Sequence, residues 1–103
     1  MKIVEASQFE GRRAWEALDI AEIDGVTVRL HWTDQPYIWH VNDGPEVFIV
    51  LDGVVEMKVR DVDVERVHRL TSGSIFHAEQ GDAHRALPIG IARILVIERK
   101  GSI

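Results

Sequence analysis

Closely spaced turn signals divide this sequence into short β-type segments, and this division most constrains its fold. Asp24-Gly25 and Asp52-Gly53 each separate two apolar, alternating segments, and such pairs tolerate the positive φ angles of a tight hairpin turn. Further reversals are predicted at 61–63, 71–73 and 79–82. Because no long segment has a convincing helical period, the chain is predicted to be all-β, a sandwich or a barrel.

The alternation of apolar and polar residues predicts the individual strands. The weakest prediction is at the N-terminus, where Met1 to Val4 is expected as a short strand before a turn or helix start at Ser7 to Glu10. We therefore treat 1–16 as an N-terminal strand and turn extension of a single domain covering 1–103. The further strands are expected at 15–23, 26–32, 38–42, 46–51, 54–60, 64–70, 74–78, 83–87 and 91–98.

Charge and composition exclude several classes of function. The chain has 12 basic and 17 acidic residues and a net charge of -5, which disfavours binding to nucleic-acid phosphates. It has no cysteine, so disulfides, thiolate nucleophiles and cysteine-ligated metals are excluded. No signal peptide or membrane-spanning segment is recognisable, and we expect a cytoplasmic protein with neither membrane nor nucleic-acid partners.

Potential metal ligands gather around residues 40–46. His40 and Asn42 point to one face of a strand, and a bend at the following turn can direct Glu46 back toward His40. His84 follows a separate turn at Gly81 and is the best candidate for a third strong ligand. Imidazole and carboxylate ligands suit a divalent Mn, Fe, Ni, Zn or Cu ion.

These residues resemble the two motifs of small single-domain bacterial cupins. The resemblance extends from about the first hairpin to Glu98. It implies the cupin double-stranded β-helix, which is a jelly-roll-like barrel, a metal ion in the barrel and a homodimer. The first motif is matched by His40, Asn42, Glu46 and Gly53, and the second by Gly73, Glu79, Gly81, His84 and Pro88.

The chain departs from the cupin motifs at three positions. Glu79 replaces the usual proline and Pro88 the usual asparagine, and Asn42 stands where the family usually has its second metal-binding histidine. An amide oxygen is a much weaker ligand for a transition metal than an imidazole. Asn42 is therefore either a fourth, weak ligand or a partner for metal-bound water or substrate.

Two classes of function follow. The first is a metalloenzyme acting on a small molecule, because cupins of this kind include isomerases, epimerases and dioxygenases. The second is a non-catalytic binding or sensing protein that has lost a strong metal site through Asn42. No catalytic residue is assigned by the sequence alone.

Substrate-pocket residues are sought on the strands beside the metal ligands. Phe48 shares a strand face with Glu46 and is a pocket candidate. Arg29 and His31 are expected on an exposed face, or, if the polar face of their strand turns inward, in the cavity. In the second case Arg29 can bind a carboxylate or a phosphate.

Trp39 and Val41 point away from His40. They are expected to form an outward apolar stripe that packs on the N-terminal strand or on a second subunit. His77 is expected at the rim of the cavity or in packing contacts, and His68 at the surface.

Overall fold

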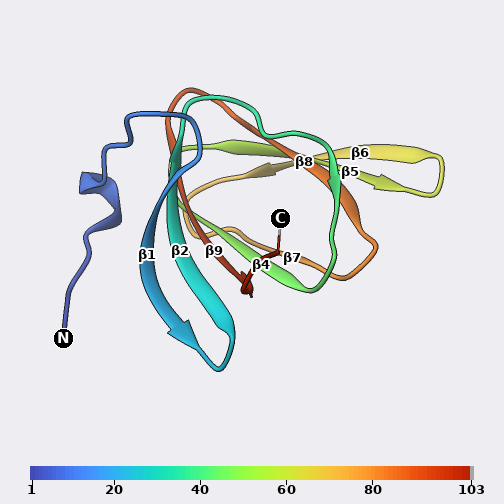
Figure 1. The fold of residues 1–103 in the computed structure, drawn as a ribbon. Helices are drawn as coiled ribbons and strands as arrows, with labels where there is room; N and C mark the ends of the chain where they lie inside the picture. Colours follow the sequence, from blue (N-terminus) through green and yellow to red (C-terminus); the bar gives the residue numbers. More distant parts are fainter. Residues whose placement is uncertain (103) are drawn as a thin grey trace.

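The computed structural model describes residues 1–102, which form two antiparallel sheets facing each other (Figure 1). Within this range the only helical element is a single 3-10 turn, η1, at Ala6–Gln8. The strands are β1 (Glu16–Ile23), β2 (Val26–Thr33), β3 (His40–Val41), β4 (Glu46–Asp52), β5 (Val55–Asp61), β6 (Val64–Leu70), β7 (Ile75–Ala78), β8 (Ala83–Pro88) and β9 (Ala92–Arg99).

The two sheets have the strand orders β1-β2-β9-β4-β7 and β3-β8-β5-β6. Neighbouring strands in each sheet are mostly distant in sequence, as in a jelly roll. The inward faces of both sheets form one barrel interior, and the β5–β6 hairpin projects beyond it (Figure 1). The predicted all-β, jelly-roll-like fold is confirmed.

Tight turns set the register of two hairpins. Asp24 and Gly25 have φ angles of 50° and 79°, and they join β1 to β2 as a paired antiparallel hairpin, as predicted. The reversal predicted at 61–63 joins β5 to β6, with Val62 at φ 54°.

The prediction of a hairpin at Asp52-Gly53 is wrong. β4 pairs with β7 and β9 in one sheet, whereas β5 pairs with β6 and β8 in the other. Both edges of β4 are already occupied, so the chain crosses between the sheets at this point. Gly53 has φ 87°, and a Cβ added there would lie 2.4 Å from the carbonyl oxygen of Ile91. The crossing therefore requires glycine for two reasons, the positive φ angle and the close backbone contact.

The strand expected at Met1 to Val4 does not form, because these residues pair with no other strand and are exposed. The N-terminal segment instead lies on the outer face of the five-stranded sheet. Arg93, which is 7% exposed, fastens it there by donating hydrogen bonds to the Phe9 carbonyl oxygen (2.8 Å) and the Glu10 carboxylate (2.6 Å).

The interior of the barrel has a closed end and an open end. The closed end holds fully buried aliphatic side chains that belong to one hydrophobic cluster. At the open end the same strands carry polar and aromatic side chains that surround a cavity. No helix in residues 1–102 is long and apolar enough to cross a membrane. The fully buried members of the core include Val50, Val55, Met57 and Ile94.

Candidate metal centre

Three of the predicted ligands meet at the open end of the barrel. His40 on β3 and His84 on β8 are directly paired in register, and their rings lie 4.3 Å apart. Glu46 begins β4 on the facing sheet. One potential ligand atom from each of the three residues lies within 4.8 Å of the other two.

Asn42 belongs to the same cluster. Its Oδ1 lies 2.6 Å from His84 Nε2, while its Nδ2 donates a hydrogen bond to the Gly44 carbonyl oxygen at 3.2 Å. The second contact fixes the orientation of the amide, because only Nδ2 can donate, and it turns Oδ1 toward the histidines. The structure thus brings together all four residues predicted as ligands.

The buried polar atoms of this cluster fit a cation. Glu46 is 7% exposed, and its Oε1 lies 3.4 Å from His84 Nε2 without a hydrogen-bond partner in the described part of the chain. Buried carboxylate oxygens are normally satisfied, so an unpartnered one beside two imidazoles and an amide oxygen indicates a site for a positive charge. The donor set is one that Mn, Fe, Ni, Zn and Cu ions accept.

The titration of His40 also suits ligation. Burial and the neighbouring His84 lower the pKa of His40, so its imidazole is neutral at pH 7. Its Nδ1 faces the Ile38 carbonyl oxygen at 3.3 Å. Because a carbonyl only accepts, Nδ1 carries the proton, and Nε2 keeps a lone pair for a metal or a ligand.

Glu98 is a site residue that the sequence prediction missed. It lies on β9 directly opposite Glu46 on β4. Burial, the hydrogen bond with Glu46 and the Glu46 charge raise the pKa of Glu98 to about 8, so at neutral pH its carboxyl keeps its proton and donates a hydrogen bond to Glu46. Burial alone would raise the pKa of Glu46, but the His84 imidazole and this Glu98 carboxyl lower it overall. The alternation Ile94, Val96, Glu98 along β9 was the available signal.

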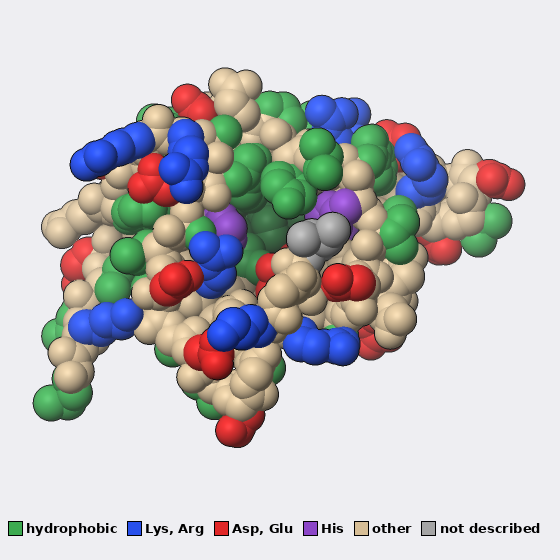
Figure 2. Space-filling model, in the orientation of Figure 1, with side chains coloured by type: hydrophobic (Ala, Val, Ile, Leu, Met, Phe, Trp, Pro, Cys, Tyr) green, Lys and Arg blue, Asp and Glu red, His purple; other side chains and the backbone are tan. Residues whose placement is uncertain are grey.

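A cavity of about 230 Å³ lies beside the cluster. Figure 2 shows it as a hollow with histidine side chains at both sides and a hydrophobic floor. The candidate pocket residue Phe48 lines the cavity, and two aromatic side chains that the sequence did not single out, Trp15 and Tyr37, form another part of its wall. Their rings contact each other edge to face at 5.1 Å.

Arg29 and His31 line the cavity, so the inward alternative for β2 is the correct one. They pair with Val96 and Ile94 of β9, which face the core. The opposite face of β2 is covered as well: Trp32 is 8% exposed and packs against the N-terminal segment at Gly11. Both faces of β2 therefore carry partly or fully buried side chains, and alternation alone did not tell which face lined the cavity.

The remaining predictions concern the outer surface. His68 on β6 and His77 on β7 are exposed. Trp39 is half-buried beneath the Arg60 guanidinium, which lies 4.4 Å from its ring centroid, and Val41 is 61% exposed. The N-terminal segment lies on the other sheet, so the alternative that it packs on the Trp39–Val41 stripe is wrong.

No protein-family model matches the sequence, and no curated protein matches it either. Solved structures do. A cupin-2 domain protein from Shewanella frigidimarina is 26% identical, with 91% of this chain and 87% of that chain covered and a TM-score of 0.78. A cupin superfamily protein from Desulfitobacterium hafniense is 18% identical, with coverages of 91% and 85% and a TM-score of 0.73.

A metal-containing enzyme has a similar fold. The iron(II) form of HppE, solved with its substrate, is 18% identical and superposes with a TM-score of 0.68. The match covers 81% of this chain and 53% of that chain. At this identity the likeness concerns the fold alone. The sheet topology and the likeness to solved cupins show that this chain has the cupin fold.

Proposed function

We propose that this protein binds a divalent metal ion at the open end of the barrel and acts there on a small molecule, as a metalloenzyme of the isomerase, epimerase or dioxygenase type. His40, Glu46 and His84 hold the metal, and the Asn42 amide oxygen is a weak fourth ligand. The observation that carries the proposal is the convergence of these ligand atoms around Glu46 Oε1, which has no hydrogen-bond partner within residues 1–102.

The bound metal supplies a positive charge that polarises a carbonyl or hydroxyl group of the substrate. The protein's own residues supply orientation and exclusion of water. Tyr37 and Phe48 form apolar walls beside the cluster. Glu98 holds a proton next to Glu46, so this pair of carboxyl groups carries one negative charge at neutral pH.

Metal titration of chelator-treated, untagged protein tests the proposal. We expect one equivalent of Mn²⁺, Fe²⁺, Ni²⁺, Zn²⁺ or Cu²⁺ to be retained, as measured by elemental analysis and calorimetry. His40→Ala and His84→Ala should each weaken binding by about 100-fold or more, because each removes a strong ligand.

Matched controls are available on the same chain. His68→Ala and His77→Ala remove exposed histidines that are not part of the four-residue cluster, and both should bind metal as the wild type does. The proposal fails if no metal is retained at stoichiometry, or if the control variants weaken binding as much as the cluster variants.

A non-catalytic ligand-binding cupin is the second candidate function. The 2.6 Å contact between Asn42 Oδ1 and His84 Nε2 favours it, because this hydrogen bond satisfies the Nε2 atom of the buried imidazole without a metal. In that case the apolar cavity holds a small molecule that is not transformed.

Replacing Asn42 separates the two candidates. If the wild type is a metalloenzyme, Asn42→His should tighten metal binding and Asn42→Ala should weaken it modestly, since imidazole is the stronger ligand. If the metal has been lost, the wild type should bind no metal and Asn42→His should create a site. Asn42→His without effect in either direction would show that residue 42 does not face the ligand cluster.

We also propose that the protein is a cytoplasmic homodimer. A row of directly paired apolar residues crosses the outer face of the five-stranded sheet. The residues at the two ends of this row are exposed to solvent, Leu18 at 38% and Ile75 at 68%. Apolar rows of this kind support an interface. Sedimentation should give a dimer, and Ile75→Lys should shift it to monomer.

A further inference from the structure

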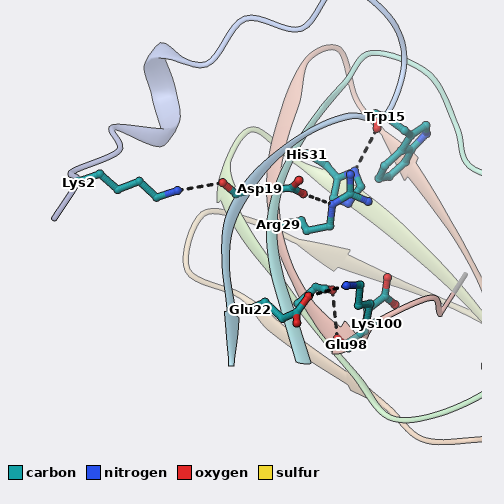
Figure 3. Close-up of polar contacts among 9 residues, drawn as sticks. Lys2, Trp15, Asp19, Glu22, Arg29, His31, Glu98 and Lys100 are labelled. Atoms are coloured by element: carbon teal, nitrogen blue, oxygen red, sulfur yellow. Dashed lines mark hydrogen bonds and ion pairs between the residues drawn. The ribbon is translucent and has the colours of Figure 1, made fainter. Parts of the chain in front are cut away.

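Arg29 and His31 form a second polar group in the cavity, apart from the metal cluster. They lie two residues apart on β2, so both point inward, and both line the cavity. Figure 3 shows their side chains side by side, beneath Trp15. None of the residues assigned to the metal cluster is hydrogen-bonded to either of them in the described chain.

The Arg29 guanidinium is oriented by Asp19. Arg29 Nε donates a hydrogen bond to Asp19 Oδ1 at 2.7 Å, and the Lys2 ammonium donates to the Asp19 carbonyl oxygen at 3.1 Å (Figure 3). β1 carries a bulge between Asp19 and Ala21, and bulges commonly redirect side chains beside binding sites. The contact uses only Nε, so the two Nη groups keep their donors for a ligand in the fork geometry that suits carboxylates.

His31 provides a hydrogen-bond acceptor beside the Arg29 donors. Its Nδ1 lies 3.1 Å from the Trp15 carbonyl oxygen, which can only accept, so Nδ1 carries the proton. Burial lowers the pKa of His31, and the ring is neutral at pH 7. Nε2 is therefore a hydrogen-bond acceptor inside the cavity, able to bind a hydroxyl group.

The size and charge of the cavity narrow the class of ligand. Its volume of about 230 Å³ lies below the roughly 300–1,000 Å³ of pockets for drug-sized ligands. Arg29 is the one cationic side chain that lines it within residues 1–102, and Glu46 is a negative charge. A singly charged carboxylate matches this balance better than a phosphate dianion, which needs more cationic partners.

We propose that the substrate is a small hydroxycarboxylic acid, with its carboxylate on the Arg29 guanidinium and its hydroxyl donating to His31 Nε2. Asp19 is a positioning residue that holds the guanidinium in place. This assignment rests on the proposed function only for the remainder of the substrate, which extends toward His40, Glu46 and His84.

Ligand titrations followed by amide NMR test the assignment on metal-free and zinc-loaded protein. The probe is lactate, with propionate, propane-1,2-diol and inorganic phosphate as comparisons. We expect saturable shifts with lactate at residues around β2, weaker binding of propionate, and no saturable binding of the diol or of phosphate. Arg29→Gln should weaken lactate binding about ten-fold or more, because a charge-assisted bidentate contact is lost.

Further variants keep the result interpretable. Arg29→Lys keeps the charge but not the fork, and should bind lactate with intermediate affinity. His31→Phe keeps an aromatic ring and should abolish the preference for lactate over propionate. Arg69→Gln, which removes an exposed arginine of β6, is the matched control and should bind as the wild type does.

Several outcomes would overturn the assignment: no saturable lactate binding, binding unchanged by Arg29→Gln, or phosphate that displaces lactate. Its failure is distinguishable from failure of the proposed metal function. If the protein binds lactate but retains no added metal at stoichiometry, the carboxylate site at Arg29 is supported and the metal centre is contradicted. If the protein retains one equivalent of metal but does not bind lactate, the metal centre is supported and the carboxylate site at Arg29 is contradicted.

Discussion

The two ends of the barrel interior are built from the same strands and yet have opposite character. Along β4 the inward side chains change from Glu46 and Phe48 at the open end to Val50 at the closed end. Along β9 they change from Glu98 and Val96 to Ile94. The closed end excludes water and stabilises the fold, whereas the open end keeps charges and a cavity together.

This difference shows how a small chain can hold a polar site inside the same core that stabilises its fold. Within residues 1–102 the polar end leaves buried atoms without hydrogen-bond partners, including Glu46 Oε1 and His84 Nδ1. Such atoms cost stability unless a ligand satisfies them. The aliphatic end must offset that cost. We therefore expect substitutions at the closed end to act mainly on unfolding, and those at the open end mainly on binding.

The largest expected effect is on stability at the closed end. Met57 is fully buried in the core cluster, and Met57→Ala should lower the free energy of unfolding by about 2–5 kcal/mol. Metal affinity of the folded protein should stay unchanged. Chemical denaturation measures the first quantity and calorimetry the second. Val67→Ala, at a 52% exposed position on β6, is the control and should cost less than about 1 kcal/mol.

Glu46→Gln, at the open end, should change metal binding strongly and the stability of the metal-free protein little. Glutamine keeps a carbonyl oxygen for the Glu98 hydrogen bond, so metal-free protein should lose no more than about 1 kcal/mol of stability. Zinc at about 100 times its Kd should stabilise the wild type by about 2.7 kcal/mol and the variant far less. Thermal unfolding with and without zinc measures both. Equal stabilisation of the two proteins would break the proposed division between the ends.

Gly53 tests the crossing between the sheets. Gly53→Ala should cost more than about 2 kcal/mol, because a positive φ and a contact with backbone atoms act together. Gly73, at φ 93°, has open space around its Cβ position, so Gly73→Ala should cost only about 1 kcal/mol. Denaturant midpoints compare them. Similar losses in both variants would show that φ alone, and not the close contact, requires glycine at residue 53.

The smallest expected effect is the pH dependence contributed by Glu98. Its pKa is raised from an ordinary 4.5 to about 8, so the folded chain keeps a proton that the unfolded chain releases. The stability that this group contributes is full below 4.5 and is lost as the pH rises through about 8. The difference in unfolding free energy between the wild type and Glu98→Gln should therefore fall across this window.

The comparison with Glu98→Gln is needed because two histidines change the pH dependence of stability in the opposite direction. The pKa values of His31 and His40 are lowered from 6.5, so their contribution to stability rises as the pH increases toward that value. Both histidines are present in the wild type and in the variant, and they cancel in the difference. A difference that does not change with pH would contradict the raised pKa of Glu98.

Local chemistry in the sequence was enough to predict the strands from β1 to β9, the first hairpin and the four residues of the candidate metal cluster, but it also predicted a strand at Met1 to Val4 that does not form. Alternation predicts which residues share a face, and the Asp24-Gly25 pair predicts its turn from the φ angles that these residues tolerate. His40, Asn42, Glu46 and His84 were found through residue type and spacing. Their role as ligands remains a prediction, although the structure brings them together.

Tertiary structure alone decided which face of β2 lines the cavity, which sheet each strand joins and what stands opposite Glu46. Alternation shows which side chains share a face of the strand but not which face points inward, so the orientation of Arg29 and His31 stayed ambiguous. The turn at Gly53 has hairpin residues, but the neighbours of β4 exclude a hairpin there. Glu98 acquires its character only by pairing with Glu46 across the sheet, and a contact between distant segments leaves no local pattern in the sequence.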